Sequence, residues 1–548
     1  MEFLNQVRIQ AETLMQQLKA DSEQPDLWRE LAEQMATLLR HEAVVACANE
    51  VLQRRPDDAG ALTLKGNALR VCGKPDEALL CYQRVLALRP KSAEGYCNLG
   101  AAYQTLGRYP EAIAAYEQAV LLNPNEPGFW GNLSASLTYS PSHTPADVRN
   151  ALERFDRQVS RPLCDSRPHT NERNPDRRLR VGYVSPDLRK HAVAYFALPL
   201  VEGHSKEQVE VFCYYNHHQE DEWTARFRQA ADHWRSCATL SDAQLAEHIR
   251  ADGIDILVDL AGHTQNNRLL TFARKPAPVQ VTWMGYVTTT GLSAMDWRIT
   301  HADADPEGAD PHYSERLWRL AGTMWCFRPL PDMPEVSAPP FARNGHVTFG
   351  CFNRYSKNSP LVLQTWANIL NRVPDSRLVI CVPEGEIRLQ MARFFSERGI
   401  HPERLAAFAK LNHKDFWKLH GEVDIALDPF PFGGGTTTCE TLWMGVPVVT
   451  VSGKEGSDFA PRFASRMGYA FLNNIGLPEL VAQTLPQYVD IAVRLAQDAP
   501  RMAQLRQSLR PRMAAAPLTG EARFVREIEA AYRAMWQDWL QNNANIST

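Results

Sequence analysis

The chain has 548 residues, 44% hydrophobic content and a formal net charge of −4, which together predict a globular protein of several domains. A net charge this small gives no electrostatic basis for binding nucleic acid or a membrane surface. The sequence contains no apolar run of about 18 residues and no signal-peptide core, so neither a membrane span nor secretion is expected. Eleven scattered cysteines without a CxxC pair are typical of reduced thiols in a cytoplasmic protein.

Residues 1–157 are predicted to be a repeat array, because a shift of 34 positions brings the sequence into register with itself. Pro56 then coincides with Pro90, and Gly66 with Gly100. This is the tetratricopeptide pattern, in which large residues of one helix pack against small residues of the next. Such arrays stack into a superhelix with a concave, peptide-binding face. We interpret the array as an arm that binds a protein or peptide acceptor; a spacer or homodimerisation arm is the alternative.

The remainder of the chain predicts two α/β domains that follow a linker. Residues 158–178 are rich in proline and charge and lack periodicity, which predicts the linker. Short apolar runs then alternate with helical segments in an N-terminal domain, 179–340, and a C-terminal domain, 341–548. Two Rossmann-like domains after a tetratricopeptide superhelix predict the GT-B plan of nucleotide-sugar glycosyltransferases, although fold alone does not fix function.

The expected strands of the two domains are Leu179–Val184, Val209–Tyr214, Ile254–Leu260, Val279–Trp283, His346–Cys351, Arg377–Val382, a strand around Ala407, Val423–Leu427 and Val446–Val451. Expected helices include Asp242–Ala251 and the amphipathic Ala522–Leu540.

A glycine- and threonine-rich loop separates the expected strands Val423–Leu427 and Val446–Val451. Gly434 and Gly435 precede Thr436 and Thr437, and a helical run follows. Backbone N–H groups and hydroxyls at a helix N-terminus, beside the carboxyl end of a strand, hold anions such as phosphate. The loop is therefore a candidate phosphate site, with an ordinary crossover loop as the alternative.

Polar residues after the strand 346–351 supply a second half of this candidate donor site. Asn353, Arg354 and Lys357 follow that strand, and a lysine there can neutralise a leaving diphosphate. Glu440, one helical turn after Thr436, is placed to accept hydrogen bonds from ribose hydroxyls. For Lys357 alone, a solvated surface lysine is the alternative.

The N-terminal domain delivers further polar residues to its strand ends. His191 follows the first expected strand, and His263 and Thr264 follow another. Ligands bind at this edge of open α/β sheets, although a helix-capping or surface histidine explains His191 equally simply. No acidic pair and no His/Cys cluster has metal-ligand spacing, so we expect a metal-independent reaction without a cofactor.

Several motifs together resemble the protein O-GlcNAc transferase family, close to its SPINDLY-like branch. They are GYVSPDLRKH, GHTQNNRL, KPAPVQVTWMGY, FGCFNRYSK and DPFPFGGGTTTCETLWMGVPVVT, in this order between residues 179 and 535. The resemblance implies a repeat arm fused to a GT-B catalytic region. It also implies inverting transfer of a sugar from a nucleotide donor to a Ser or Thr hydroxyl.

The resemblance also implies roles for five residues. His191 matches the family's active-site histidine beside sugar and acceptor, and Lys357 matches the catalytic lysine on the donor diphosphate. Thr436 and Thr437 match the diphosphate-binding pair. Glu440 takes the position of a ribose-binding acid, which is aspartate in the animal enzymes.

Three departures from the family pattern leave the donor open. Phe416 stands where the animal enzymes stack a histidine on uracil, His413 replaces a lysine of the nucleoside pocket, and Arg354 replaces a glutamine near the diphosphate. The leading prediction is UDP-GlcNAc as donor; the alternatives are GDP-fucose or another hexose donor, and a repeat scaffold with an inactive catalytic half. The general base is not assigned: His191, a donor phosphate oxygen or a water chain would serve.

Overall fold

The computed structural model describes residues 2–409 and 411–542. Met1 of the predicted arm, and residues 410 and 543–548 of the predicted C-terminal domain, lie outside the described residues. The chain forms two compact units, treated separately below. The repeat unit comprises Met1–Ser136, Arg354–Ala367 and Ile380–Lys410, and the α/β unit comprises Leu137–Asn353, Asn368–Val379 and Leu411–Thr548. Among the described residues, no helix combines the length and apolar character that crossing a membrane requires.

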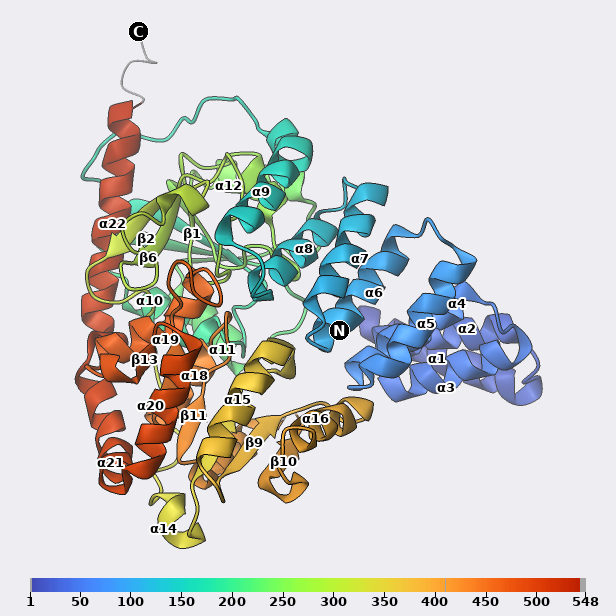
Figure 1. The fold of residues 1–548 in the computed structure, drawn as a ribbon. Helices are drawn as coiled ribbons and strands as arrows, with labels where there is room; N and C mark the ends of the chain where they lie inside the picture. The colour runs from blue at the N-terminus through green and yellow to red at the C-terminus, as the bar shows by residue number, and fades with distance from the viewer. Residues whose placement is uncertain (1, 410, 543–548) are drawn as a thin grey trace. The chain divides into compact units, whose positions relative to one another are not determined.

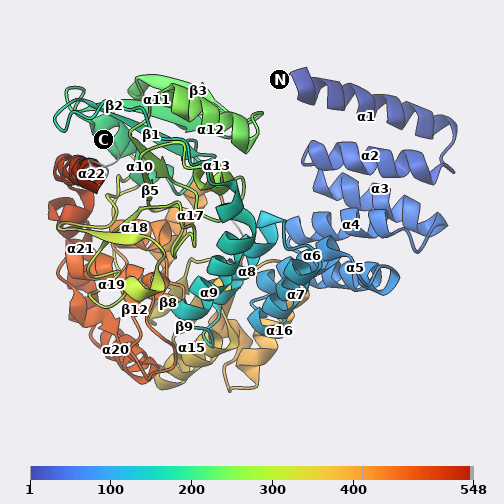
Figure 2. The ribbon, with the colours of Figure 1, turned by 90° about the horizontal axis from the view of Figure 1, so that it is seen from above.

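The repeat unit contains a row of helices that follow one another in chain order (Figures 1 and 2). They are α1 (Glu2–Ala20), α2 (Pro25–Thr37), α3 (His41–Arg54), α4 (Ala59–Val71), α5 (Pro75–Leu88), α6 (Ala93–Thr105), α7 (Tyr109–Leu122) and the start of α8 (Pro127–Tyr139). A Cβ on Gly66 would lie 2.6 Å from the ring of Tyr82, and one on Gly100 would lie 2.9 Å from Tyr116. The aligned glycines therefore let each helix pair pack closely, which confirms the repeat interpretation.

Segments from much later in the chain complete the repeat unit. They are η4 (Tyr355–Lys357), the first part of α15 (Pro360–Arg372), the end of β9 (Arg377–Cys381), α16 (Glu386–Ser396), η5 (Pro402–Arg404) and β10 (Leu405–Phe408). The segment that carries Lys357 thus belongs to the same compact unit as the repeats.

The α/β unit contains a seven-stranded sheet with the order β3-β2-β1-β4-β5-β6-β7, in which every neighbouring pair is parallel. Its strands are β1 (Leu179–Ser185), β2 (Val209–Tyr215), β3 (His233–Ser236), β4 (Ile256–Asp259), β5 (Val279–Thr282), β6 (Trp297–His301) and β7 (Arg316–Leu320). The sequence predicts β1, β2, β4 and β5 but not the other three.

A second sheet has the order β10-β9-β8-β11-β12-β13. Its other strands are β8 (Thr348–Cys351), β11 (Ile425–Leu427), β12 (Val448–Val451) and the short, unpredicted β13 (Val481–Ala482). The pairs β8–β11, β11–β12 and β12–β13 are parallel. A helical repeat region followed by two parallel α/β sheets confirms the predicted GT-B fold.

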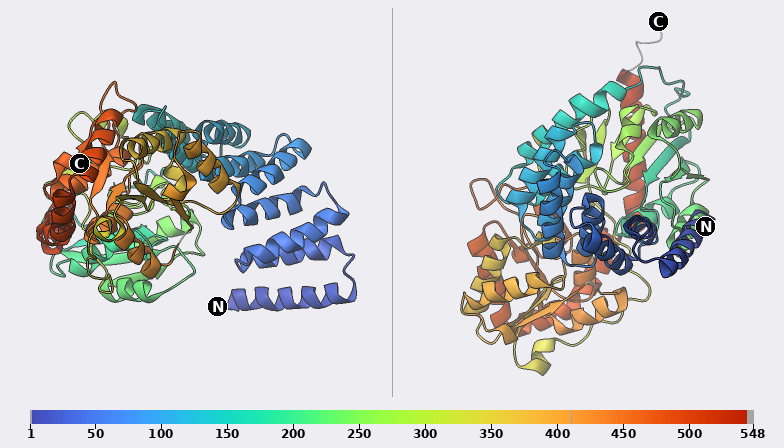
Figure 3. Two further views of the ribbon diagram at one scale, coloured as in Figure 1. Left: turned by 60° about the horizontal axis from the view of Figure 1, so that its bottom comes forward. Right: turned by 90° about the vertical axis from the view of Figure 1, so that its right-hand side faces the viewer.

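Helices cover the sheets of the α/β unit (Figures 1 and 3). They are α9 (Pro145–Phe155), α10 (Ala194–Gly203), α11 (Glu222–Ala230), α12 (Asp242–Ala251), α13 (Leu269–Ala273), α14 (Pro340–Asn344), α17 (His413–Leu419), α18 (Thr436–Trp443), α19 (Phe463–Asn474), α20 (Leu485–Gln497), α21 (Ala499–Ala515) and α22 (Glu521–Asn542). The last helix, α22, packs on the first sheet, since the hydroxyls of Tyr532 and Tyr183 are 3.2 Å apart.

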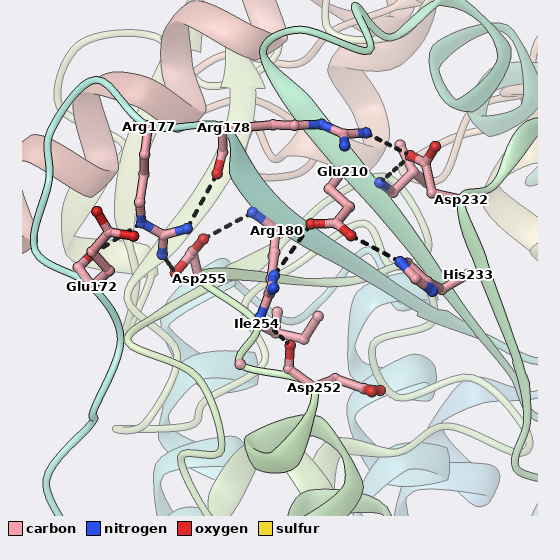
Figure 4. A network of polar contacts seen from close by, with 12 residues as sticks. Glu172, Arg177, Arg178, Arg180, Glu210, Asp232, His233, Asp252, Ile254 and Asp255 are labelled. Atoms are coloured by element: carbon pink, nitrogen blue, oxygen red, sulfur yellow. Dashed lines mark hydrogen bonds and ion pairs between the residues drawn. The ribbon is translucent and has the colours of Figure 1, made fainter.

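An ionic network anchors the predicted linker at the amino-terminal ends of the first strands (Figure 4). Arg177 pairs with the buried carboxylate of Asp255, which also accepts the backbone N–H of Arg180 at 2.8 Å. Glu210 joins Arg180 at 3.2 Å and His233 at 2.8 Å. This edge of the sheet lies opposite the strand ends that carry the candidate site residues, so its charges are structural.

Candidate active site

The loop after β11 is held by the carboxylate of Asp428, which lies directly after the strand. Its Oδ1 accepts the backbone N–H of Gly434 at 2.8 Å and a side-chain N–H of Asn353 at 3.4 Å. Its Oδ2 accepts the hydroxyl of Thr450 at 2.9 Å. Because Asp428 is buried, these bonds fix the loop firmly to the ends of β8, β11 and β12.

The glycines let the backbone of this loop approach neighbouring atoms so closely that a side chain at these positions would not fit. A Cβ on Gly434 would lie 2.2 Å from the hydroxyl oxygen of Thr438. Gly435 is the N-cap of α18 and has no side chain to accept the N–H groups of the first turn. Together with the half-buried Thr436 and Thr437, these N–H groups form an arrangement that suits an anion.

Glu440 lies on α18, one turn beyond the two threonines, and is buried. Its Oε1 accepts the indole N–H of Trp417 at 3.3 Å. Burial raises the pKa of this carboxyl to about 7, and the tryptophan bond offsets only part of that rise. Glu440 is therefore a buried acid that readily gains or loses a proton near neutral pH.

An aromatic cluster flanks this acid on α17 and at the end of β8. Phe352 stacks on the ring of His420, with centroids 3.9 Å apart. Phe416 meets His420 edge-on at 4.8 Å and keeps part of its ring exposed. Burial lowers the pKa of His420 to about 3, so its ring is neutral and the cluster presents an uncharged aromatic surface.

His413 begins α17 and faces the first sheet's side of the α/β unit. Its Nδ1 lies 3.5 Å from the hydroxyl of Tyr195, on α10. The rings of His413 and Trp417 have centroids 5.6 Å apart. The structure therefore brings His413 together with Tyr195 of α10 and Trp417 of its own helix, α17.

His191 follows β1 and keeps 41% of its side chain exposed. Its Nδ1 accepts the backbone N–H of Val193 at 3.3 Å and lies 3.5 Å from Oδ2 of Asp187. When Nδ1 accepts a hydrogen bond, a neutral ring carries its proton on Nε2; protonation of both nitrogens lets Nδ1–H pair with Asp187 instead. The histidine thus has the acidic side chain of Asp187 beside its Nδ1.

His263 is enclosed rather than open to ligand. Its Nε2–H donates to the carbonyl of Thr290 at 2.7 Å, and burial lowers its pKa to about 4. The rings of Phe155 and Tyr286 lie edge-on at 5.5 Å. Thr264 donates its hydroxyl to its own turn, to the carbonyl of Ala261 at 2.8 Å. Both residues hold the loops at the strand ends in place.

Arg354 and Lys357 belong to the repeat unit, on the segment that follows β8. Arg354 is exposed and Lys357 is half-buried. Lys357 ends the short helix η4, where its backbone N–H donates to the carbonyl of Arg354 at 3.0 Å. In the sequence, Lys357 comes four residues after Asn353. The side chain of Asn353 donates a hydrogen bond to Asp428 within the α/β unit.

A cavity of about 320 Å³ opens in the α/β unit next to the aromatic residues that back the glycine loop. Its wall includes Val148 of α9, Thr288, Ala309 and Phe463. Phe463 in turn packs on Trp325, whose ring lies 3.2 Å from the Cβ position of Gly435. Two aromatic side chains, Phe463 and Trp325, thus connect the wall of this cavity to the candidate anion loop.

Sequence reasoning missed the residues that shape the site from behind, chiefly Asp428, Trp325, Tyr195 and Trp417. The position of Asp428 after a buried strand was a signal, because strand ends carry binding groups in such sheets. The others are large aromatic residues whose contacts depend on segments distant in sequence. Among the described residues, no group of three or more His, Cys, Asp or Glu side chains is placed to hold a metal ion.

Two parallel α/β sheets, with a glycine- and threonine-rich loop and an aromatic cluster at their strand ends, have the architecture of the GT-B class of glycosyltransferases. A family model described as glycosyl transferase family 41 matches residues 162–327 and 342–528. Two tetratricopeptide models match residues 66–107 and 93–126. Because the first match covers more than half of the chain, this protein belongs to glycosyl transferase family 41.

Relatives from plants match about two thirds of the chain. A probable UDP-N-acetylglucosamine–peptide N-acetylglucosaminyltransferase SPINDLY from Petunia hybrida is 40% identical over 382 residues, 68% of this chain and 40% of the relative. The probable transferase SEC of Arabidopsis thaliana is 30% identical over 370 residues, 66% of this chain and 37% of the relative. The chain thus spans about two fifths of the length of these relatives.

One solved structure matches nearly the whole chain. It is a lysine-to-methionine mutant of the Thermobaculum terrenum O-GlcNAc transferase, with a TM-score of 0.87 and 36% identity. The match covers 94% of this chain and 98% of the other. The fold of this chain is therefore shared with that protein over nearly all of its length.

Proposed function

We propose that the protein transfers N-acetylglucosamine from UDP-GlcNAc to Ser or Thr hydroxyls of protein acceptors. The observation that carries this proposal is the loop fixed by Asp428, which presents the first turn of α18 with Thr436 and Thr437. The relatives named as peptide N-acetylglucosaminyltransferases support the choice of sugar and acceptor.

In the proposed reaction, the acceptor hydroxyl oxygen attacks the anomeric carbon of the sugar. The bond from that carbon to the β-phosphate oxygen breaks on the opposite face, so the configuration inverts and UDP leaves with the bonding pair. Thr436, Thr437 and the α18 N-terminus receive the diphosphate, and Lys357 neutralises the charge that grows on it. Asn353, Arg354, Gly434 and Gly435 complete the donor-binding set.

The nucleoside is assigned to the aromatic end of the site. Phe416 offers a partly exposed ring for the base, His413 lies beside it, and Glu440 accepts hydrogen bonds from the ribose. The sequence predicts that His263 and Thr264 bind the donor. In this proposal they act on donor binding indirectly, because their polar groups hold the strand-end loops.

Among the strand-end residues of the first sheet, we propose His191 as a recipient of the acceptor proton. A base must present an unprotonated nitrogen, and a ring in which Nδ1 accepts from Val193 carries its proton on Nε2. In this tautomer the unprotonated nitrogen of His191 is Nδ1, which already accepts the N–H of Val193, whereas a phosphate oxygen of the donor is a base that needs no change in this bond. Both routes therefore remain in the proposal.

A second donor is favoured by one specific feature. Phe416 replaces the histidine expected on uracil, and a phenyl ring stacks on any base because every base has an aromatic face. GDP-fucose or another hexose donor is therefore the alternative on the same scaffold. A scaffold without activity is the third alternative.

The repeat array is proposed to bind the protein acceptor, either as a monomer or within a homodimer. The cavity walled by Phe463 is proposed to receive a side chain of that acceptor, since Phe463 packs on Trp325 behind the donor loop. All eleven cysteines are free in the structure, which supports the proposed cytoplasmic location.

Measuring nucleotide release from UDP-GlcNAc, UDP-GalNAc, UDP-glucose and GDP-fucose, with and without a Ser/Thr-rich peptide, tests the proposal. We expect UDP release from UDP-GlcNAc, stimulated by the peptide, and a peptide mass increase of one N-acetylhexosamine. GDP release from GDP-fucose with no UDP release would establish the second donor. If no donor is turned over and none is bound, the inactive scaffold is the reading that stands.

A further inference from the structure

The turn between α6 and α7 touches the chain on both sides of Lys357, within the repeat unit. The hydroxyl of Tyr109, the first residue of α7, donates to the backbone carbonyl of Ser356. Gly107 precedes it in a left-handed conformation (φ +70°), and a Cβ there would lie 3.3 Å from the carbonyl oxygen of Asn358. The residues immediately before and after Lys357 therefore both contact this one repeat turn.

These contacts are buried and act on a short, locally bonded turn. Tyr109 is 1% exposed, and Tyr355 and Asn358 are also buried. The N–H of Asn358 donates to the carbonyl of Tyr355 at 2.7 Å, which closes the turn around Lys357. Since the carbonyl of Ser356 is part of the peptide bond that enters Lys357, the bond from Tyr109 fixes the plane from which the lysine side chain projects.

Packing within the repeat accounts for the buried ring of Tyr109, but it does not require the hydroxyl. One unit earlier in the 34-residue register, the position aligned with Tyr109 is Pro75, and α5 forms there equally well. The hydroxyl of Tyr82, by contrast, stays inside the array and donates to Asn67 at 2.8 Å. The hydroxyl of Tyr109 thus donates to the segment that carries Lys357.

The preceding repeat turn meets the same distant part of the chain. A Cβ on Gly73 would lie 3.7 Å from Pro383, just before α16. Asp76 of α5 is hydrogen-bonded to Gln390 of α16, and its pKa is raised by burial and by the nearby Glu386. Two successive repeat turns therefore pack against later segments of the same unit. The α4–α5 turn lies against the chain before α16, and the α6–α7 turn lies against the segment of Lys357.

We propose that Tyr109 is a positioning residue for Lys357, so that this repeat is a structural part of the catalytic centre and not only an acceptor-binding arm. The inference rests on the proposed function, in which Lys357 neutralises the departing diphosphate. A lysine that acts on charge developing in the transition state must be held in place beforehand. If the side chain of Lys357 becomes less ordered, we expect kcat to fall and the affinity for either substrate to stay the same.

The variant Tyr109→Phe removes the hydroxyl alone, and Tyr82→Phe removes a matched hydroxyl inside the array. We expect Tyr109→Phe to lower kcat roughly three- to tenfold, the range set by one buried hydrogen bond. The decrease should be the same for peptide glycosylation and for acceptor-free donor hydrolysis, with KM for donor and peptide unchanged. Tyr82→Phe should keep the parent kcat. Thermal unfolding of both variants gives the accompanying loss of stability.

A second pair of variants acts through the glycines of the two turns. Gly107→Ala and Gly73→Ala introduce similar backbone strain, since the two glycines have φ +70° and +79°. Only the first places a methyl group tightly against the carbonyl of Asn358. If the two variants lose the same amount in melting temperature, Gly107→Ala should therefore lower kcat more than Gly73→Ala.

Measuring Lys357→Met alongside these variants separates the role of Lys357 in the proposed reaction from the positioning role of Tyr109. If Lys357→Met is inactive while Tyr109→Phe matches the parent, the positioning role is overturned and the proposed function stands. A loss of kcat in Tyr82→Phe equal to that in Tyr109→Phe also overturns it, because general loosening of the array would then be the cause. Full activity of Lys357→Met would overturn the role of the lysine and, with it, the inference.

Discussion

The backbone N–H of Gly434 donates to Oδ1 of Asp428 over 2.8 Å, so a carboxylate six residues earlier sets the shape of the anion loop. Its other oxygen is occupied by Thr450 of the adjacent strand. A buried carboxylate with several donors cannot be replaced by an amide without leaving a donor facing a donor.

Asp428→Asn should therefore weaken donor binding about tenfold or more, with a loss of about 1–3 kcal/mol of unfolding free energy. Isothermal titration with UDP and denaturant unfolding measure the two effects. Asp490→Asn, which changes only an exposed ion pair with Arg372, serves as the control. Unchanged UDP affinity in Asp428→Asn would show that the loop keeps its shape without the carboxylate.

Gly434→Ala tests the loop by crowding instead of by charge. The added methyl carbon would lie 2.2 Å from the hydroxyl of Thr438, so the first turn of α18 must shift. We expect at least a tenfold loss of UDP affinity, because N–H groups at a helix N-terminus bind an anion only when they converge on it. Gly128→Ala, at an exposed position of α8, should bind UDP normally. Equal affinity in both variants would contradict the assignment of the loop.

Glu440→Gln should change how stability depends on pH. Burial raises the pKa of Glu440 from 4.5 to about 7, so between these values the folded protein holds a proton that the unfolded chain has lost. The associated stabilisation is complete below pH 4.5 and is lost as the pH rises through 7. Glutamine has no such dependence, and the stability difference should shift in its favour by about 3 kcal/mol at most from pH 5 to pH 8.

Denaturant unfolding at the two pH values measures this shift, with Glu403→Gln, at an exposed site, as the control variant. Parallel stability profiles for Glu440→Gln and the parent would mean that Glu440 titrates as an ordinary exposed acid.

Phe416→Ala should weaken nucleotide binding by removing the ring on which the base is proposed to stack. Loss of a base–aromatic contact costs about 1–3 kcal/mol, or roughly five- to 100-fold in affinity. Phe416→Trp should retain binding. Phe394→Ala removes another half-buried ring, in the repeat unit, and should leave affinity unchanged. Comparing UDP with GDP shows which base the pocket prefers, and equal binding in Phe416→Ala would place the base elsewhere.

Lys357→Met should lower transfer at least about 100-fold, because one preorganised electrostatic contact in a transition state contributes on the order of 3 kcal/mol. UDP binding should survive in part, since the α18 N-terminus and its threonines remain. Lys91→Met, at an exposed position in the same unit, is the matched control. Undiminished transfer by Lys357→Met would remove the lysine from the mechanism.

The central strands and the loop after β11 could be predicted because their signals are local. Apolar runs such as Val279–Trp283 are long enough to indicate a buried strand, and the helix Asp242–Ala251 was predicted to its ends. Glycines and threonines next to a strand end indicate an anion site by composition alone.

The missed strands lack this local signal. The strand β3, His233–Ser236, is short, half-buried and polar, and it lies at a sheet edge. Within β6, Arg298 reads as a surface residue, yet it is buried and donates to the carbonyls of Tyr286 and Thr288 at 3.1 and 2.9 Å. Such a position depends on acceptors from another segment, which no periodicity records.

The back of the candidate site was hidden for the same reason. Asp428 and Thr450 are 22 residues apart, and Tyr195 and His413 are 218 apart, so tertiary packing alone brings each pair together. The domain limits at 157, 178 and 340 stay a prediction, as do the roles assigned to the site residues.

The packing of the α6–α7 turn on the Lys357 segment bears on how this protein can be re-engineered. Arg354–Ala367 and Ile380–Lys410 share a compact unit with the repeats, although they lie more than 200 residues away in sequence. A chimera that exchanges only residues 1–157 for a foreign array would leave the carbonyl of Ser356 without its tyrosine donor. Modular swaps that retain activity should carry both later segments with the array, or keep the α6–α7 turn of this chain at the junction.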